Sequence, residues 1–218
     1  SPNHGMTVRE IEADGFTPDA RVDLELGDDS SLGIARSMAL GLEGFAREYA
    51  RLKPDWAVVL GDRYEILSAV EAALISRIPV AHLGGGDVTE GAMDDAIRHS
   101  ITKMAHLHFV SNEDAARRIR QLGENPKSAF VVGSTTIDTL IHAPKMDREP
   151  FFQEIGFHPR AKNILMTFHP ETLASQTPTQ QLTELFHALD AFSEDFGILI
   201  TRPNADPGNL EINRLIDQ

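Results

Sequence analysis

Between residues 56 and 142 the sequence alternates short apolar runs with longer amphipathic segments. Each apolar run is short enough for a buried strand, and each following segment spaces its apolar residues as a helix does. Parallel strands need such crossover helices between them, so the alternation predicts an α/β fold with a parallel sheet covered on both faces. The expected strands are WAVVL (56–60), IPVAHL (78–83), LHFVS (107–111) and AFVVG (129–133).

The rest of the chain predicts further elements of both kinds. Asp28, Ser30 and Ser31 offer N-caps for a long helix that ends near Arg51. The other expected elements are a short helix over 5–14, a strand over 21–26, strands over 163–168 and 197–201, a helix from about residue 179, and a helix-like run at the end of the chain.

Residues 143–161 separate two predicted domains. This stretch has mixed composition and contains three prolines, which is typical of a boundary. We therefore expect two Rossmann-like, doubly wound parallel-sheet domains, over 1–150 and 151–218. Both are expected to be incomplete in this chain, with a first strand–helix unit before residue 1 and much of the second domain after residue 218.

Composition excludes several kinds of partner. The formal net charge of −13 argues against a nucleic-acid surface. There is no cysteine, which excludes disulfides and fits a reducing cytoplasm. No apolar stretch approaches the roughly 20 residues of a membrane span, and the sequence shows no signal segment. We expect a cytoplasmic protein without membrane or nucleic-acid partners.

Charged residues gather where the expected strands end. Asp62 follows the strand over 56–60, and Asp87 follows Gly84–Gly86 at the end of the next strand. A helix then begins with Asp94 and carries Arg98 four residues later on the same face. Ligands bind beyond the carboxyl ends of parallel strands in such folds. The sequence therefore predicts a ligand site here.

Structural roles compete with this prediction. Asp62 could simply cap the next helix, and Asp94 could stabilise a helix N-terminus or form a weak surface ion pair with Arg98. The glycine run matches neither the GxGxxG dinucleotide fingerprint nor the GxxxxGK[ST] phosphate loop. His99, His106 and His108 lack a known zinc spacing, so polar core roles are the simpler interpretation.

Five segments together resemble the UDP-N-acetylglucosamine 2-epimerase family, and specifically its hydrolysing branch of the sialic and legionaminic acid pathways. The longest segment is also the most specific. The segments are VVLGDRYEILSA (58–69), HLGGGDVTEGAMDDAIRHSITKMAHLHF (82–109), VVGSTTID (131–138), MTFHPET (166–172) and RPNAD (202–206).

The resemblance implies a glycosyltransferase-B-like arrangement, a UDP-sugar substrate and a homo-oligomer, dimer or tetramer. The implied reaction removes the proton at sugar C2, eliminates UDP through a glucal-like intermediate and adds water to give N-acetylmannosamine. No cofactor or metal is implied. By their place in the motifs, the catalytic residues are Asp62, Asp94 and His169, and the substrate-binding residues are Arg63, Asp87, Arg98, Asn204 and Asp206.

One position departs from the family pattern. Gly84 stands where many members carry a glutamate, and Asp87 is the carboxylate nearest in sequence that could take its place. Three alternatives stay open besides N-acetylmannosamine formation. The substrate could be UDP-N,N'-diacetylbacillosamine, the chain could be a UDP-sugar binding module without turnover, or it could be a retaining glycosyltransferase. A non-hydrolysing epimerase fits less well, because those members usually carry an EExNR pattern at residues 94–98.

Overall fold

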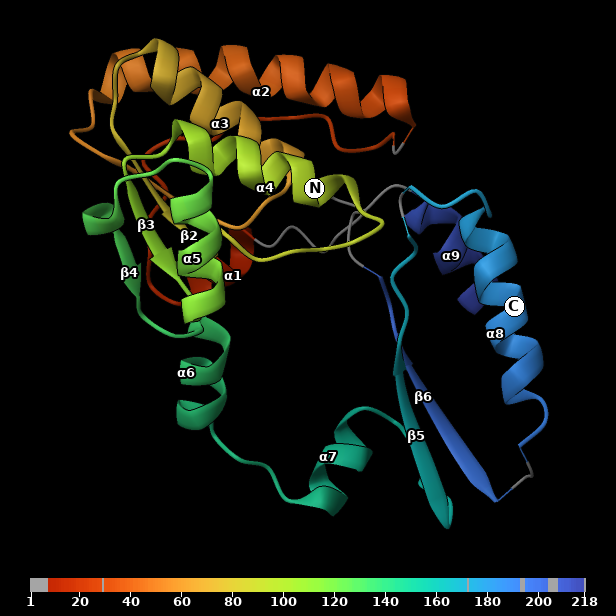
Figure 1. The fold of residues 1–218 in the computed structure, drawn as a ribbon. Coiled ribbons are helices and arrows are strands. Elements are labelled where there is room, and N and C mark those ends of the chain that lie inside the picture. Colours follow the sequence, from red (N-terminus) through yellow and green to blue (C-terminus); the bar gives the residue numbers. More distant parts are fainter. Residues whose placement is uncertain (1–7, 29, 172, 193–194, 204–207, 218) are drawn as a thin grey trace. The chain divides into compact units, whose positions relative to one another are not determined.

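The computed structural model describes residues 8–28, 30–171, 173–192, 195–203 and 208–217 (Figure 1). Contacts divide the chain into two units, Ser1–Asp138 and Thr139–Gln218. The domain boundary at residue 150, expected from the sequence, stays a prediction.

The first unit is built on a four-stranded parallel sheet. The strands follow one another in chain order across the sheet, and Ala57 pairs with Val80 while His82 pairs with His108. This order confirms the α/β class and the parallel sheet. The strands are β1 (Ala57–Leu60), β2 (Val80–Leu83), β3 (Leu107–Val110) and β4 (Ala129–Val131).

Helices connect the strands and carry most of the core. The helix α2 begins after Ser30, whose side chain accepts a hydrogen bond from the Gly33 N–H, as the capping pattern predicts. Val70 and Ile101 meet Val80 in the main core cluster. The helices are α1 (Val8–Ala13), α2 (Ser31–Leu52), α3 (Tyr64–Ile75), α4 (Met93–Met104), α5 (Glu113–Gln121) and α6 (Thr135–His142), with a 3-10 turn at Pro126–Ser128.

The edge strand β1 is buried on one face only. Ala57 and Val59 face the core, whereas Val58 and Leu60 are 70% and 59% exposed. The expected cover on both faces of the sheet therefore does not extend to β1 in the described part of the chain.

The prediction of a strand over residues 21–26 is wrong. This segment is irregular although its apolar and polar residues alternate. Glu25 has a φ of 51°, and its N–H donates to the Asp23 side chain at 3.0 Å. Asp23 thus forms a local turn with its own neighbours, a common alternative to strand pairing for aspartate.

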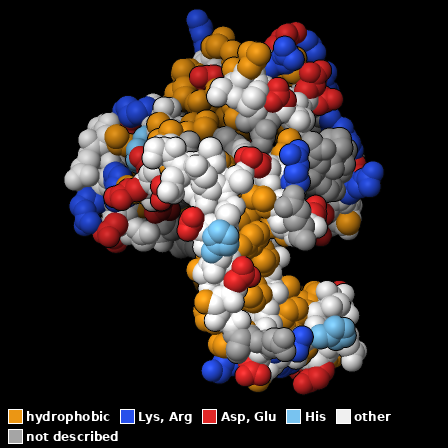
Figure 2. All heavy atoms as spheres, turned by 90° about the vertical axis from the view of Figure 1, so that its right-hand side faces the viewer, with side chains coloured by type: hydrophobic (Ala, Val, Ile, Leu, Met, Phe, Trp, Pro, Cys, Tyr) orange, Lys and Arg blue, Asp and Glu red, His pale blue; other side chains and the backbone are white. Residues whose placement is uncertain are grey.

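The second unit pairs two parallel strands with helices. Thr177 and Gln180 form a reciprocal capping box at the start of α8. The face of the molecule drawn in Figure 2 carries exposed hydrophobic side chains. In the second unit, Leu165 on β5 is one of the exposed apolar residues. The elements are α7 (Arg148–Glu154), β5 (Lys162–Thr167), α8 (Pro178–Leu189), β6 (Phe196–Thr201) and α9 (Asn209–Ile216).

Among the residues described, we find no helix with the length and apolar character that crossing a membrane requires.

Candidate active site

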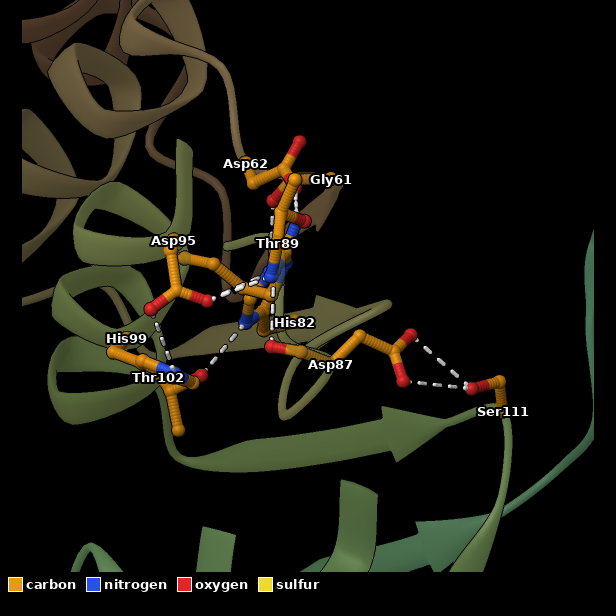
Figure 3. Close-up of polar contacts among 10 residues, drawn as sticks. Gly61, Asp62, His82, Asp87, Thr89, Asp95, His99, Thr102 and Ser111 are labelled. Carbon is orange, nitrogen blue, oxygen red and sulfur yellow. Dashed lines mark hydrogen bonds and ion pairs between the residues drawn. The ribbon is translucent and has the colours of Figure 1, made fainter. Parts of the chain in front are cut away.

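Polar side chains from four elements meet at the carboxyl edge of the first unit's sheet (Figure 3). Asp62 follows β1, the loop over 84–92 follows β2, and Ser111 follows β3. The helix α4 then contributes its first two turns. Parallel strands end at the same edge, so residues far apart in sequence become neighbours there.

Arg98 is the centre of this cluster and is buried, with 6% of the residue exposed. Its Nη2 forms an ion pair with Asp62 and donates to the Thr89 hydroxyl at 2.8 Å. Its Nη1 donates to the Asp87 carbonyl oxygen at 2.9 Å. One planar guanidinium thereby joins the end of β1 to two points of the loop after β2, a task suited to the fork of an arginine.

Asp95 fixes the same loop from the first turn of α4. The backbone N–H of Thr89 donates to Asp95 Oδ1 at 2.9 Å. Asp95 Oδ1 is also 3.6 Å from Arg98 Nη1, and Asp95 Oδ2 is 3.7 Å from His99 Nε2. The carboxylate therefore holds the loop in addition to lying at the positive end of a helix dipole.

The helix cap expected as the simpler role of Asp62 is not what the structure shows. The N-cap residue of α3 is Arg63, and it makes no side-chain cap hydrogen bond. The Asp62 carboxylate is instead paired with Arg98. Arg63 itself lies beside Glu65, with 3.1 Å between Arg63 Nη2 and Glu65 Oε1.

The glycine run has a clear structural reason. Gly84 and Gly86 have φ angles of 81° and 84°, which side-chain-bearing residues rarely adopt. A Cβ on Gly86 would lie 2.5 Å from the carbonyl oxygen of Ala115, and a Cβ on Gly85 would lie 2.9 Å from His82 Nδ1. The absence of side chains therefore allows the loop backbone to pack closely against α5 and against His82.

His82 is a member of the cluster that the sequence analysis missed. It is fully buried on β2, and its Nε2 lies 2.9 Å from the Gly61 carbonyl oxygen. A carbonyl only accepts, so Nε2 carries the proton, and the Thr102 hydroxyl at 3.5 Å can donate to Nδ1. Burial lowers the pKa of His82 to about 4, which keeps the ring neutral. The available signal was its position two residues before Gly84, the first glycine of the run.

Acid should destabilise the first unit through His82. The unfolded chain takes up a proton at His82 near pH 6.5, whereas the folded chain does so only near pH 4. Between these values the unfolded state holds more protons. The free energy of unfolding should therefore rise with pH, by up to about 1.4 kcal/mol per pH unit, and this contribution should stay constant above pH 6.5. Urea unfolding of wild type and His82→Asn at pH 4.5 and 7 checks this; equal pH dependence in both would contradict it.

Two other histidines of the region lie on β3 or directly before it. His108 is fully buried on β3, and burial lowers its pKa. His106 Nδ1 accepts the Val80 N–H at 3.2 Å. Within the residues that the structure describes, no group of three or more His, Cys, Asp or Glu could hold a metal ion.

Four other residues were expected in the site from the sequence, and the structure describes two of them, Asp94 and His169. Asp94 is half-buried in the first turn of α4, one turn before Arg98. His169 follows β5 in the second unit and is exposed. That it acts together with the carboxylates of the first unit stays a prediction. Asn204 and Asp206 lie outside the described residues.

The fold and the cluster define an α/β protein with a candidate ligand site at the carboxyl edge of a parallel sheet, built from an arginine and several carboxylates. The chain belongs to the UDP-N-acetylglucosamine 2-epimerase family, whose model matches residues 1–218.

Individual relatives carry more specific names. The chain is 36% identical to a GDP/UDP-N,N'-diacetylbacillosamine 2-epimerase (hydrolyzing) of Campylobacter jejuni, over 99% of this chain and 56% of the relative. It is 35% identical to the polysialic acid biosynthesis protein P7 of Escherichia coli, over 98% of this chain and 54% of the relative. The chain thus spans about half the length of these relatives.

A solved structure supports the fold. The chain superposes on the UDP-GlcNAc 2-epimerase of Methanocaldococcus jannaschii, in complex with UDP-GlcNAc and UDP, with a TM-score of 0.72. The identity is 20%, and the match covers 95% of this chain and 57% of that one. The comparison supports the α/β fold with a parallel sheet. The two-domain, glycosyltransferase-B-like arrangement expected from the sequence stays a prediction.

Proposed function

We propose that this chain carries the proton-transfer site of a hydrolysing UDP-N-acetylglucosamine 2-epimerase, which forms N-acetylmannosamine and UDP for sialic acid and capsule biosynthesis. The observation that carries the proposal is the Arg98 cluster. A buried guanidinium fixes Asp62 and the loop of Asp87 at the edge of the sheet where such folds bind ligands. Asp94 lies one turn away on the same helix.

The reaction needs two proton transfers and the departure of a diphosphate. A carboxylate removes the proton from sugar C2, the bond from C1 to the UDP oxygen breaks, and a double bond forms between C1 and C2. Water then adds its hydroxyl at C1 while a proton returns to C2 from the opposite face. Asp62 and Asp94 are the proposed acid and base, because positioned carboxylates are suited to such transfers.

The developing negative charge on UDP needs cations and hydrogen-bond donors. We assign this role to Arg63 and to His169 of the second unit, with Asn204 and Asp206 on the nucleotide side. Arg98 and Asp87 line the sugar side. The proposed protein needs no cofactor, acts in the cytoplasm on a UDP-sugar and forms a homo-oligomer.

A second substrate is supported by a specific comparison. The Campylobacter jejuni relative at 36% identity is named for GDP- or UDP-linked N,N'-diacetylbacillosamine. The same proton transfers on that sugar would serve legionaminic acid synthesis. The two substrates share the acetamido group at C2 and differ at C4 and C6.

Release of UDP in the absence of any acceptor tests the proposal. The natural full-length protein is incubated with each UDP-sugar, and UDP and the free sugar are quantified. We expect equal amounts of UDP and of the 2-epimeric sugar from one of the two substrates. Binding without UDP release would favour a binding module, and release only with an added acceptor would favour a glycosyltransferase.

A further inference from the structure

The Asp87 carboxylate points away from the Arg98 cluster and toward the end of β3 (Figure 3). The Ser111 hydroxyl lies there, 3.4 Å and 3.3 Å from the two carboxylate oxygens of Asp87. The backbone of Asp87 is held separately, through its carbonyl oxygen, by Arg98. Asp87 is thus fixed at both ends by residues from different elements.

The Asp87 carboxylate only accepts, so Ser111 donates to it, and the neighbouring Asn112 leaves the Ser111 hydrogen available for this bond. Asn112 Oδ1 accepts the Ala115 N–H at 2.9 Å and so caps α5. This fixes the amide so that Nδ2 faces the other way, where it donates to Ser111 Oγ at 3.0 Å. Because Oγ accepts from Asn112, its single hydrogen is free to point at Asp87.

The loop before Asp87 is attached to the same helix. Arg118 of α5 donates from Nη1 to the Gly86 carbonyl oxygen. Gly86 also lies so close to the Ala115 carbonyl that a Cβ would clash there. The first turns of α5 therefore hold both the backbone next to Asp87 and, through Asn112 and Ser111, its carboxylate.

We infer that Ser111 is a positioning residue, which the Asn112 amide orients so that its hydroxyl holds the Asp87 carboxylate in one orientation at the carboxyl edge of the sheet. The inference rests on the proposed function, because it takes Asp87 as a carboxylate of that site. It gives a role to Asp87, the carboxylate nearest in sequence to Gly84, where many family members carry a glutamate.

Kinetics of three variants in the natural full-length protein test the inference. Ser111→Ala should lower kcat for UDP release by about 10- to 100-fold, as expected for losing a hydrogen bond to a charged group, with KM changed less than about twofold. Ser111→Thr keeps a hydroxyl and should restore most of kcat. Asn112→Ser keeps a helix cap but loses the amide donor, so we expect a smaller loss. Ser100→Ala, on the exposed face of α4, is the control.

A merely structural role for Ser111 would give equal losses in Ser111→Ala and Ser111→Thr, or a loss that follows thermal stability, and either result would overturn the inference. Crystal structures of wild type and Ser111→Ala give a readout independent of turnover: the Asp87 carboxylate should lose its single orientation in the variant. An unchanged carboxylate would refute the inference. Absence of UDP release from the wild type would refute the proposed function instead.

Discussion

Replacing Arg98 with lysine is expected to lower kcat/KM for UDP release by at least about 100-fold, a loss typical of removing one preorganised donor from a site. The lysine keeps the positive charge and can still approach Asp62. It cannot reach Asp62, the Thr89 hydroxyl and the Asp87 carbonyl in the geometry that the two Nη atoms provide. The loop between β2 and α4 would lose two of its anchoring hydrogen bonds, those that Arg98 donates to the Asp87 carbonyl and to the Thr89 hydroxyl.

The same substitution should also lower the free energy of unfolding, by about 1–3 kcal/mol, because a partly buried acceptor is left without its donor. Steady-state kinetics and urea unfolding measure both effects. Arg47→Lys is the matched control, since the Arg47 side chain is 69% exposed and forms an ion pair with Glu43 on the exposed face of α2. Equal activity of Arg98→Lys and wild type would show that the fork of Arg98 is not needed.

Asp94→Asn is the second substitution with a large expected effect. Asparagine has nearly the same shape but cannot take up a proton, so kcat should fall by about 10²- to 10⁴-fold, as for the loss of a general acid or base. Asp94 is not the N-cap of α4, whose N-cap residue is Ala92. We therefore expect the melting temperature to change by no more than a few degrees.

The neighbouring residue offers the matched control. Asp95→Asn is equally conservative and lies on the same helical turn. Its Oδ1 can still accept the Thr89 N–H, which is the contact that Asp95 makes with the loop. Kinetics and circular dichroism of both variants should show a much larger kcat loss for Asp94→Asn. A larger loss of kcat for Asp95→Asn than for Asp94→Asn would assign the acid or base role to Asp95 and contradict its assignment to Asp94.

Much of the fold could be predicted because its signals are local. The strands β1 to β4 coincide with apolar runs, and the helices between them show helical spacing of apolar residues. The segment over 21–26 shows where local signals fail. Its alternation indicates a strand, but a strand needs a neighbour to pair with, and the Asp23 turn with Glu25 is a competing local choice.

The site could be predicted in part for the same reason. The positions of Asp62 and Arg98 at strand and helix ends are visible in the sequence, but their pairing across 36 residues depends on the order of strands in the sheet. His82 and Ser111 were missed because each lies within or just after an apolar run and reads as part of a strand. Only the packed structure shows that the His82 ring contacts Gly61 and that the Ser111 hydroxyl faces Asp87.

The central claim is that carboxylates of this chain exchange the proton at sugar C2 while UDP leaves. Turnover of the UDP-sugar in deuterated water by the natural full-length protein tests it most directly, with NMR of the free sugar as the readout. The account predicts one deuterium at C2 of the 2-epimeric product in every molecule that accompanies released UDP. Release of UDP with a sugar that keeps its original hydrogen and configuration at C2 would contradict it.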